Sequence, residues 1–279
     1  MSTEAQRARE NLGARLRDLR KEAGLTGRAL AALAGWQLSK VSKIEHGKQN
    51  ATAEDVRTWC HHCNAESRAA DLVASVRNIE TLWTEWRRAL HAGTRLRQRR
   101  SLDLYEKTHI FRVYNPNMIW GTLQTAEYAE TILRQLVSFL DDVPDDVEEG
   151  VAARMERQQY LYRGDRRFNV ILGEQALYTN IGGAGVMRGQ LDRLLAVMTL
   201  PRLSLGIIPA RAPYEIWPGD MFIMFDDRMV MLETYSAELT ITEPNEIAAY
   251  GKAFALLQRS AVYGDLARRL IMEALAQLV

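Results

Sequence analysis

The sequence predicts a mainly α-helical chain of two parts, a bundle of five helices followed by a mixed α+β domain. Apolar residues recur at helical spacing through residues 5–91, while short β-type apolar runs occur only after residue 167. Charge divides the chain too: residues 1–100 carry 19 Lys and Arg against 11 Asp and Glu, and the remainder carries 17 against 24. We therefore expect a first domain over 1–91, a hinge over 92–104 and a second domain over 105–279.

Glycines and capping residues divide the first part into short helices. A helix over residues 5–22 should end at Gly24, and Thr26 is a typical N-cap for a second, short helix. Gly35 marks the next turn, and a third helix is expected over Gln37–Glu45. These signals predict two short helices joined by a tight turn.

Two more helices complete the predicted bundle. Thr52 followed by Asp55 is similar to a capping box, although the acid is Asp rather than Glu or Gln, and it predicts a fourth helix over residues 53–63. A long amphipathic helix is expected over residues 67–91.

Two short helices joined by a turn that contains glycine are the helix-turn-helix arrangement of DNA-binding proteins. Val41 and Ile44 should fasten the third helix to the core, which leaves its other face for the major groove. The basic charge of this part favours a polyanionic partner, double-stranded DNA. The predicted DNA-contacting residues are Thr26, Arg28, Gln37, Leu38, Ser39, Lys40, Ser42, Lys43, Lys48 and Asn50.

Residues 5–64 resemble the phage-repressor-like helix-turn-helix regulators, the XRE or Cro/cI type. The resemblance implies that Arg20 pairs with Glu45 of the recognition helix. One position departs from the family pattern: Gly27 stands where the family often has a glutamine that braces a phosphate. That role must pass to Arg28 or Thr26, or be absent.

The second part mixes strands and helices without regular βαβ repetition, which favours an α+β fold. The basic stretch Gly93–Arg100 is interpreted as the hinge into it. Strands are expected at 168–172, 203–209, 221–225 and 229–234, and helices at 123–140, 147–163, 186–198, 244–260 and 265–278.

Three blocks of the second part resemble the C-terminal domain of an actinobacterial family of WhiJ-like, antitoxin-like regulators. They are Gly121-Thr-Leu-Gln-Thr-Ala-Glu-Tyr-Ala129, Arg154-Met-Glu-Arg-Gln-Gln159, and Glu174-Gln-Ala-Leu with Gly182–Leu191. The first departs from the family pattern at Trp120 and Thr122. The resemblance implies a transcriptional regulator of development or specialised metabolism, often encoded beside a small partner protein.

Arg154, Arg157 and Gln158 fall on one side of a helix and could hold a carboxylate or phosphate. An internal network with Glu174 is the favoured alternative. Trp217, with Tyr214 and Phe222, could line a ligand pocket or partner surface, although ordinary packing is the simpler use. Residues 182–185 could cradle an anion, but a plain loop is favoured because the phosphate-binding motifs are incomplete.

Other chemistry finds little support in the sequence. Cys60-His-His-Cys63 cannot direct four ligands at one ion from a single helix, so no metal and no cofactor is expected. No catalytic constellation is present, and we expect no enzyme. The composition is 47% apolar and 25% charged with a mean hydropathy of −0.25, and the polar start and two cysteines favour a cytoplasmic protein without membrane or signal segments.

Together these patterns predict a sequence-specific DNA-binding regulator that pairs as a homodimer on a pseudo-palindromic operator. The second domain should hold the dimer and receive a ligand or protein signal. The alternative is an antitoxin-like protein that sequesters a small partner encoded nearby and regulates its own operon.

Overall fold

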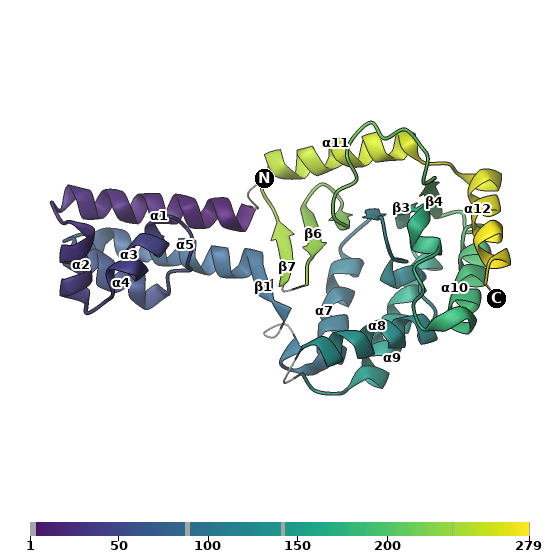
Figure 1. The fold of residues 1–279 in the computed structure, drawn as a ribbon, viewed down its shortest axis with the longest axis horizontal. Helices are drawn as coiled ribbons and strands as arrows, with labels where there is room; N and C mark the ends of the chain where they lie inside the picture. The colour runs from purple at the N-terminus through teal and green to yellow at the C-terminus, as the bar shows by residue number, and fades with distance from the viewer. Residues whose placement is uncertain (1–3, 87–89, 141–142, 236, 279) are drawn as a thin grey trace. The chain divides into compact units, whose positions relative to one another are not determined.

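The computed structural model describes residues 4–86, 90–140, 143–235 and 237–278, and the chain divides into two compact units, Met1–Thr84 and Glu85–Val279 (Figure 1). This boundary precedes the expected one, which lay at residue 91. Each unit is described by itself. No helix among the described residues is long and apolar enough to cross a membrane.

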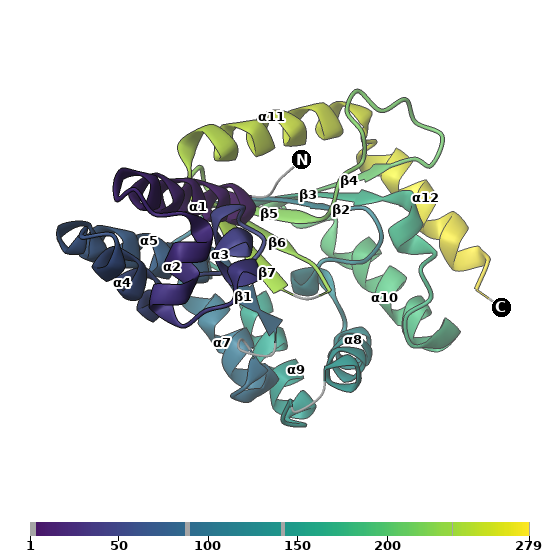
Figure 2. The ribbon, with the colours of Figure 1, turned by 60° about the vertical axis from the view of Figure 1, so that its left-hand side comes forward.

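The described residues of the first unit form the five expected helices, which come forward in the view of Figure 2. They are α1 (Glu4–Glu22), α2 (Gly27–Ala34), α3 (Leu38–Glu45), α4 (Ala53–His62) and α5 (Ala69–Leu82), with a 3-10 turn, η1 (Glu66–Arg68), before the last. The last helix is shorter than the expected 67–91, because strand β1 (Trp83–Glu85) follows it directly.

Large apolar side chains at helical spacing hold this unit together. Leu16, Leu30, Ile44 and Trp59 are all almost completely buried. The Trp59 indole Nε1 donates a hydrogen bond to the backbone oxygen of Leu16 at 2.9 Å, so the one polar atom of that ring is satisfied inside the core. α1 and α4 are thereby joined by packing and by a buried hydrogen bond.

The α1 and α3 backbones meet at Gly13. A Cβ atom placed there would lie 2.4 Å from the backbone oxygen of Ile44 and 2.8 Å from that of Glu45. Atoms cannot approach so closely, so only glycine allows this contact between α1 and the C-terminal turn of α3.

Caps set the helix boundaries largely as expected. The Thr26 hydroxyl accepts from the Ala29 N–H at 3.1 Å, and Gly35 ends α2 with φ at 69°. Thr52 and Asp55 form a complete reciprocal capping box at α4, with hydrogen bonds of 3.0 and 3.1 Å. An aspartate therefore serves here in the role that glutamate or glutamine usually fills.

A mixed sheet forms the centre of the second unit, where the described strands run in the order β7-β6-β5-β2-β3-β4. β2, β3 and β4 run parallel to one another. β5 pairs antiparallel with β2, and the β5–β6 and β6–β7 pairs are antiparallel as well. The strands are β2 (Ile110–Asn115), β3 (Arg167–Gly173), β4 (Leu203–Ile208), β5 (Phe222–Phe225), β6 (Met229–Glu233) and β7 (Ala237–Ile241).

Four of these strands and all the helices expected after residue 120 are present, which confirms the mixed character of this part. β2 and β7 were not expected, and the parallel half has the helical crossovers that we did not anticipate. The helices are α7 (Gly93–Glu106), α8 (Ala126–Phe139), α9 (Val147–Arg157), α10 (Gly183–Val197), α11 (Pro244–Ser260) and α12 (Gly264–Ala276).

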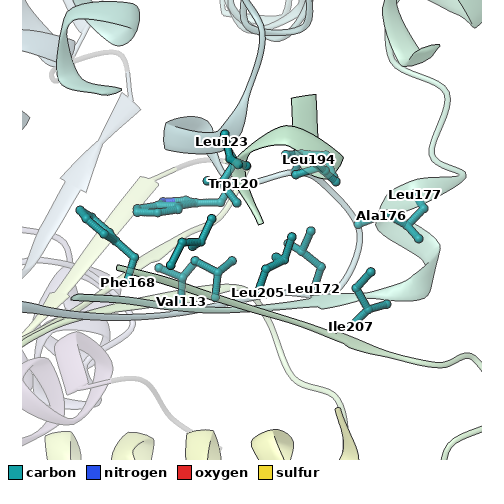
Figure 3. Close-up of a cluster of buried hydrophobic side chains, with 14 of the residues drawn as sticks. Val113, Trp120, Leu123, Phe168, Leu172, Ala176, Leu177, Leu194, Leu205 and Ile207 are labelled. Atoms are coloured by element: carbon teal, nitrogen blue, oxygen red, sulfur yellow. The ribbon is translucent and has the colours of Figure 1, made fainter. Parts of the chain in front are cut away.

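Helices cover both faces of the sheet, with α11 on one side and α8, α9 and α10 on the other (Figure 2). Because side chains alternate along a strand, Val113 and Val170 enter one core while Tyr114 and Ile171 enter the other. Figure 3 shows the first core, where strand residues such as Phe168 and Leu205 meet Trp120 and Leu123 from the segment after β2.

The hinge expected over residues 92–104 is wrong, because residues 93–106 form α7, which packs against α9. Its buried face carries Thr94, Gln98 and Ser101, so no apolar periodicity reveals it in the sequence. Asp146 caps its N-terminus: the carboxylate accepts from the Thr94 N–H at 2.6 Å and from the Arg95 N–H at 3.0 Å. These hydrogen bonds lower the pKa of Asp146 in spite of the partial burial that opposes them.

Candidate nucleic-acid interface

Helix α3 has one buried and one exposed face, as a recognition helix requires. Val41 and Ile44 are 1% and 2% exposed and anchor the helix in the core. The opposite face is open to solvent and presents a mixture of apolar, hydroxyl and cationic groups suited to base edges and phosphates. Its exposed residues are Gln37, Leu38, Ser39, Ser42 and Lys43.

The N-terminal ends of α2 and α3 provide positive potential without acidic residues to cancel it. Neither helix has Asp or Glu in its first turn, whereas α4 has Glu54 and Asp55 there. The free N–H groups and the helix dipole make such ends favourable for phosphate. Arg28 lies exposed in the first turn of α2 and adds a full positive charge.

A buried ion pair fixes the far end of α3. Arg20 donates to both carboxylate oxygens of Glu45, from Nε at 2.6 Å and from Nη2 at 3.1 Å. Its Nη1 donates to the Leu25 backbone oxygen at 2.7 Å, so one side chain also holds the loop before α2. The hydrogen bond to Glu45 raises the pKa of Arg20. The pairing implied by the family resemblance is confirmed.

Lys40 has two partners within the first unit. Its Nζ lies 2.6 Å from Asp55 Oδ1 and 4.5 Å from the centroid of the Trp36 ring, and the side chain is half-buried. Asp55 and the indole of Trp36 already hold its ammonium group, so a phosphate contact by Lys40 would compete with these partners and stays a prediction. Its place in the structure is to fasten α3 to the start of α4.

Several other expected contacts are exposed but have local partners. The Thr26 hydroxyl is used in the α2 cap, and the Asn50 Oδ1 accepts from Arg9 Nη1 at 3.3 Å. Ser39 Oγ lies 3.5 Å from Gln37 Oε1, a weak contact that leaves the hydroxyl available. Lys48 is exposed in the loop after α3.

Gly27 lies against the recognition helix. A Cβ there would be 3.5 Å from Leu38 Cδ1 and 3.7 Å from Val41 Cγ1, which is ordinary van der Waals contact. A side chain therefore fits sterically, and the transfer of the bracing role to Arg28 or Thr26, or its absence, stays a prediction. Arg28, the residue after Gly27, is exposed and polar.

Arg17 is a further basic residue beside α3 that sequence reasoning did not select. Its Nε lies 4.0 Å from Glu45 Oε2, and almost half of its side chain is exposed. The sequence signal that could have identified Arg17 is its position one helical turn before Arg20, on the side of α1 that faces the recognition helix.

The Cys60–Cys63 segment is part of the core of the first unit. Both thiols are free and buried, and burial raises the pKa of Cys60 and raises that of Cys63 to about 11. His61 instead lies exposed, with Nδ1 3.2 Å from Glu66. Among the described residues no group of three or more His, Cys, Asp or Glu side chains is arranged to hold a metal ion.

In the second unit Arg154, Arg157 and Gln158 come together as expected, but not with Glu174. Arg154 Nη1 donates to Gln124 Oε1 at 2.7 Å, and Gln158 Nε2 donates to the Gln124 backbone oxygen at 2.5 Å. Glu174 instead accepts from the Ala210 N–H at 2.5 Å. The favoured internal network with Glu174 is therefore wrong, and amides take its place around these arginines.

Trp217 stands apart from that cluster. It lies in the segment between β4 and β5 and is 65% exposed, while its neighbours Tyr214 and Ile216 pack against the core on the α11 face of the sheet. Phe222 is buried in that core, so these aromatics do not line one pocket. Gly182, with φ at 76°, is the N-cap of α10, and no side chain caps that helix.

A bundle of this architecture, with an exposed face on the second helix of a helix-turn-helix, defines a DNA-binding helix-turn-helix protein. The family model described as "Helix-turn-helix domain" matches residues 11–72. A second model, "Domain of unknown function (DUF5753)", matches residues 98–273, and the chain belongs to this family.

No curated protein matches the chain. A solved structure with a TM-score of 0.32 and 10% identity covers 86% of this chain and 88% of its own, and is entitled "Structure of TrmBL2, an archaeal chromatin protein, shows a novel mode of DNA binding".

Proposed function

We propose that the protein is a cytoplasmic, sequence-specific transcriptional regulator of the phage-repressor-like type, acting in development or specialised metabolism. The observation that carries the proposal is the exposed face of α3, where Ser39, Ser42 and Lys43 stand beside Leu38 on a helix that Val41 and Ile44 hold rigidly. Hydroxyl and ammonium groups reach acceptors on base edges, and a leucine packs on a thymine methyl group.

The protein binds its operator as a homodimer. A single helix reads only a few base pairs, and two recognition helices spaced by one turn of B-DNA, about 34 Å, read a pseudo-palindrome. The second unit provides the dimer contact and receives a ligand or protein signal, and it has no catalytic role.

The experiment is selection of binding sites from random DNA with the full-length protein, followed by affinity measurements on the selected site. The variant S39A/S42A changes the preferred sequence or lowers specific affinity by tenfold or more, because each good base contact contributes about 1–3 kcal/mol of discrimination. The matched control is Ser67→Ala, an exposed serine of η1 in the same unit, which leaves both unchanged. Equal site preference in S39A/S42A and wild type would overturn the assignment of α3.

A further inference from the structure

Two helices of the second unit bring arginine side chains together, α7 with Arg97 and α9 with Arg154 and Arg157. The α9 pair lies against the 3-10 turn η2 (Gly121–Leu123). α7 and α9 lie side by side in Figure 2 and make extensive contact. The cluster lies outside the candidate DNA interface.

Arg97 has acidic partners of its own. Its Nη2 is hydrogen-bonded to Glu238, and Glu233 lies 3.8 Å from the same nitrogen. Burial raises the pKa of Glu238, while the charge of Arg97 opposes that change. These two carboxylates are thus engaged on the α7 side of the cluster.

Arg154 and Arg157 have no carboxylate so close, although Glu233 acts on Arg154 at longer range and favours its charge. Within the described part of the chain, no carboxylate lies within 4.0 Å of either guanidinium. Arg154 donates to two neutral amide oxygens of the described residues, those of Gln124 at 2.7 Å and Gln98 at 3.4 Å. Arg157 is 7% exposed, its guanidinium lies 5.1 Å from the centroid of the Tyr105 ring, and its buried Nε has no hydrogen-bond partner.

The two guanidinium groups meet over Gly121. The position that a Cβ atom would take on this glycine is 3.3 Å from Arg157 Nη2 and 3.8 Å from Arg154 Cζ. Both cationic groups therefore approach one point at the start of η2, where the absence of a side chain lets them lie against the main chain. Arg154 is partly exposed, whereas Arg157 is buried, so Arg154 is the more accessible of the two.

Two adjacent cations, one buried and one partly buried, are unfavourable when no carboxylate is paired directly with either, because desolvation and mutual repulsion both oppose their charge. Burial, together with the charge of Arg157, lowers the pKa of Arg154 to about 10. Arginine keeps its charge at neutral pH, so the repulsion is relieved by an anion. Guanidinium groups present N–H donors in a fork that fits the oxygens of carboxylate and phosphate.

We propose that Arg154 and Arg157 form the binding site for the oxyanion group, carboxylate or phosphate, of a small ligand. The idea that this ligand is a signal for the regulator rests on the function proposed above. The binding site itself rests on the arginine pair alone. Arg157 is the buried anchor, Arg154 is the more accessible donor, and Gly121 lets both approach.

The test is titration of the full-length protein with inorganic phosphate and, separately, with acetate, at constant ionic strength with chloride as the reference anion. Binding is measured by calorimetry and by protein fluorescence, since Trp120 stacks on Tyr105 beneath Arg157. At least one of the two anions binds saturably to the wild type. The anion with the higher affinity shows whether the ligand group is a phosphate or a carboxylate. Arg154→Gln and Arg157→Gln each weaken binding roughly tenfold or more, whereas Arg269→Gln, an exposed arginine of α12, leaves it unchanged.

Gly121→Ala keeps both charges but crowds Arg157 Nη2, so it provides a second variant if the glutamine variants fold poorly. It weakens anion binding in a protein whose circular dichroism matches the wild type. The inference is overturned if neither anion binds saturably to the wild type, or if R154Q, R157Q and G121A bind it as tightly as the wild type.

Operator binding by the anion-free wild type, measured in parallel, separates the two proposals. A protein that binds its operator but no anion refutes the site and leaves the proposed function intact. A protein that binds the anion at Arg157 but no DNA refutes the proposed function and keeps the site.

Discussion

The Arg20 guanidinium donates hydrogen bonds to both carboxylate oxygens of Glu45, at 2.6 and 3.1 Å, and both side chains are largely excluded from solvent. This pair joins α1 to the last turn of the recognition helix. Because Arg20 also holds the Leu25 backbone oxygen, one residue sets the positions of both ends of the helix-turn-helix.

Removal of one partner of this pair should be costly. Arg20→Met leaves the Glu45 carboxylate buried without a counter-charge and should lower the free energy of unfolding by about 3 kcal/mol. The double variant R20M/E45L should recover most of that loss, since it leaves no buried charge. Urea unfolding followed by circular dichroism measures both, and an equal loss in the single and double variants would contradict this explanation.

Gly13 and Gly27 form a matched pair of glycines on helices. Gly13→Ala places a methyl group 2.4 Å from the Ile44 backbone oxygen and should destabilise the first unit by about 2 kcal/mol or more. Gly27→Ala meets side-chain atoms only at 3.5 Å and beyond, and should be neutral or stabilising by up to about 1 kcal/mol. Thermal unfolding of the two variants provides the comparison, and equal effects would refute the close approach of α1 to α3.

Lys48 and Lys40 should differ in how they affect DNA binding. Lys48 is exposed, so Lys48→Gln should weaken binding uniformly across sequences and reduce the slope of log K against log salt by about 0.9. Lys40 is held by Asp55, so Lys40→Gln should lower stability and leave the slope unchanged. Affinity measured over a range of salt concentrations checks both, and a reduced slope for K40Q would place Lys40 among the phosphate contacts.

The buried Cys63 thiol should make stability fall at alkaline pH. Burial raises its pKa from 9.0 to about 11, so the unfolded chain loses this proton first as the pH rises. The native state then binds more protons than the unfolded state, and stability decreases between about pH 9 and pH 11. The free energy of unfolding, measured across this pH range for the wild type and Cys63→Ala, gives the contribution of the thiol. The free energy of the variant should fall less steeply with pH, and parallel curves for the two proteins would contradict this role of Cys63.

Most of the first unit could be predicted from local chemistry. Thr26, Gly35 and the Thr52–Asp55 box mark helix ends through contacts within a few residues, so the sequence carries them directly. The engagement of Lys40 could not be foreseen, because Asp55 approaches it only when α4 packs on α3.

The second unit was harder to predict wherever charged or polar residues face inward. β2 was missed because Arg112 interrupts its apolar run, although its guanidinium reaches Asp227 at 2.9 Å. β7 was missed because it carries the partly buried Glu238, whose position depends on Arg97 far away in the sequence. The buried face of α7 is polar for the same reason: its partners come from distant segments such as the one containing Asp146.

The place of β2 at the junction of the parallel and antiparallel halves of the sheet has a consequence for folding. Among the described strands that lie wholly within the second unit, β2 comes first along the chain, yet its neighbours are β3 and β5, which are synthesised much later. A growing chain can pair one edge of β2 with β3 once residues 167–173 have been made, but its other edge stays unpaired until residues 222–225 follow, and closure of the sheet waits for these distant contacts. Any truncation before β5 leaves one edge of β2 open, so the second unit should assemble as a whole rather than strand by strand.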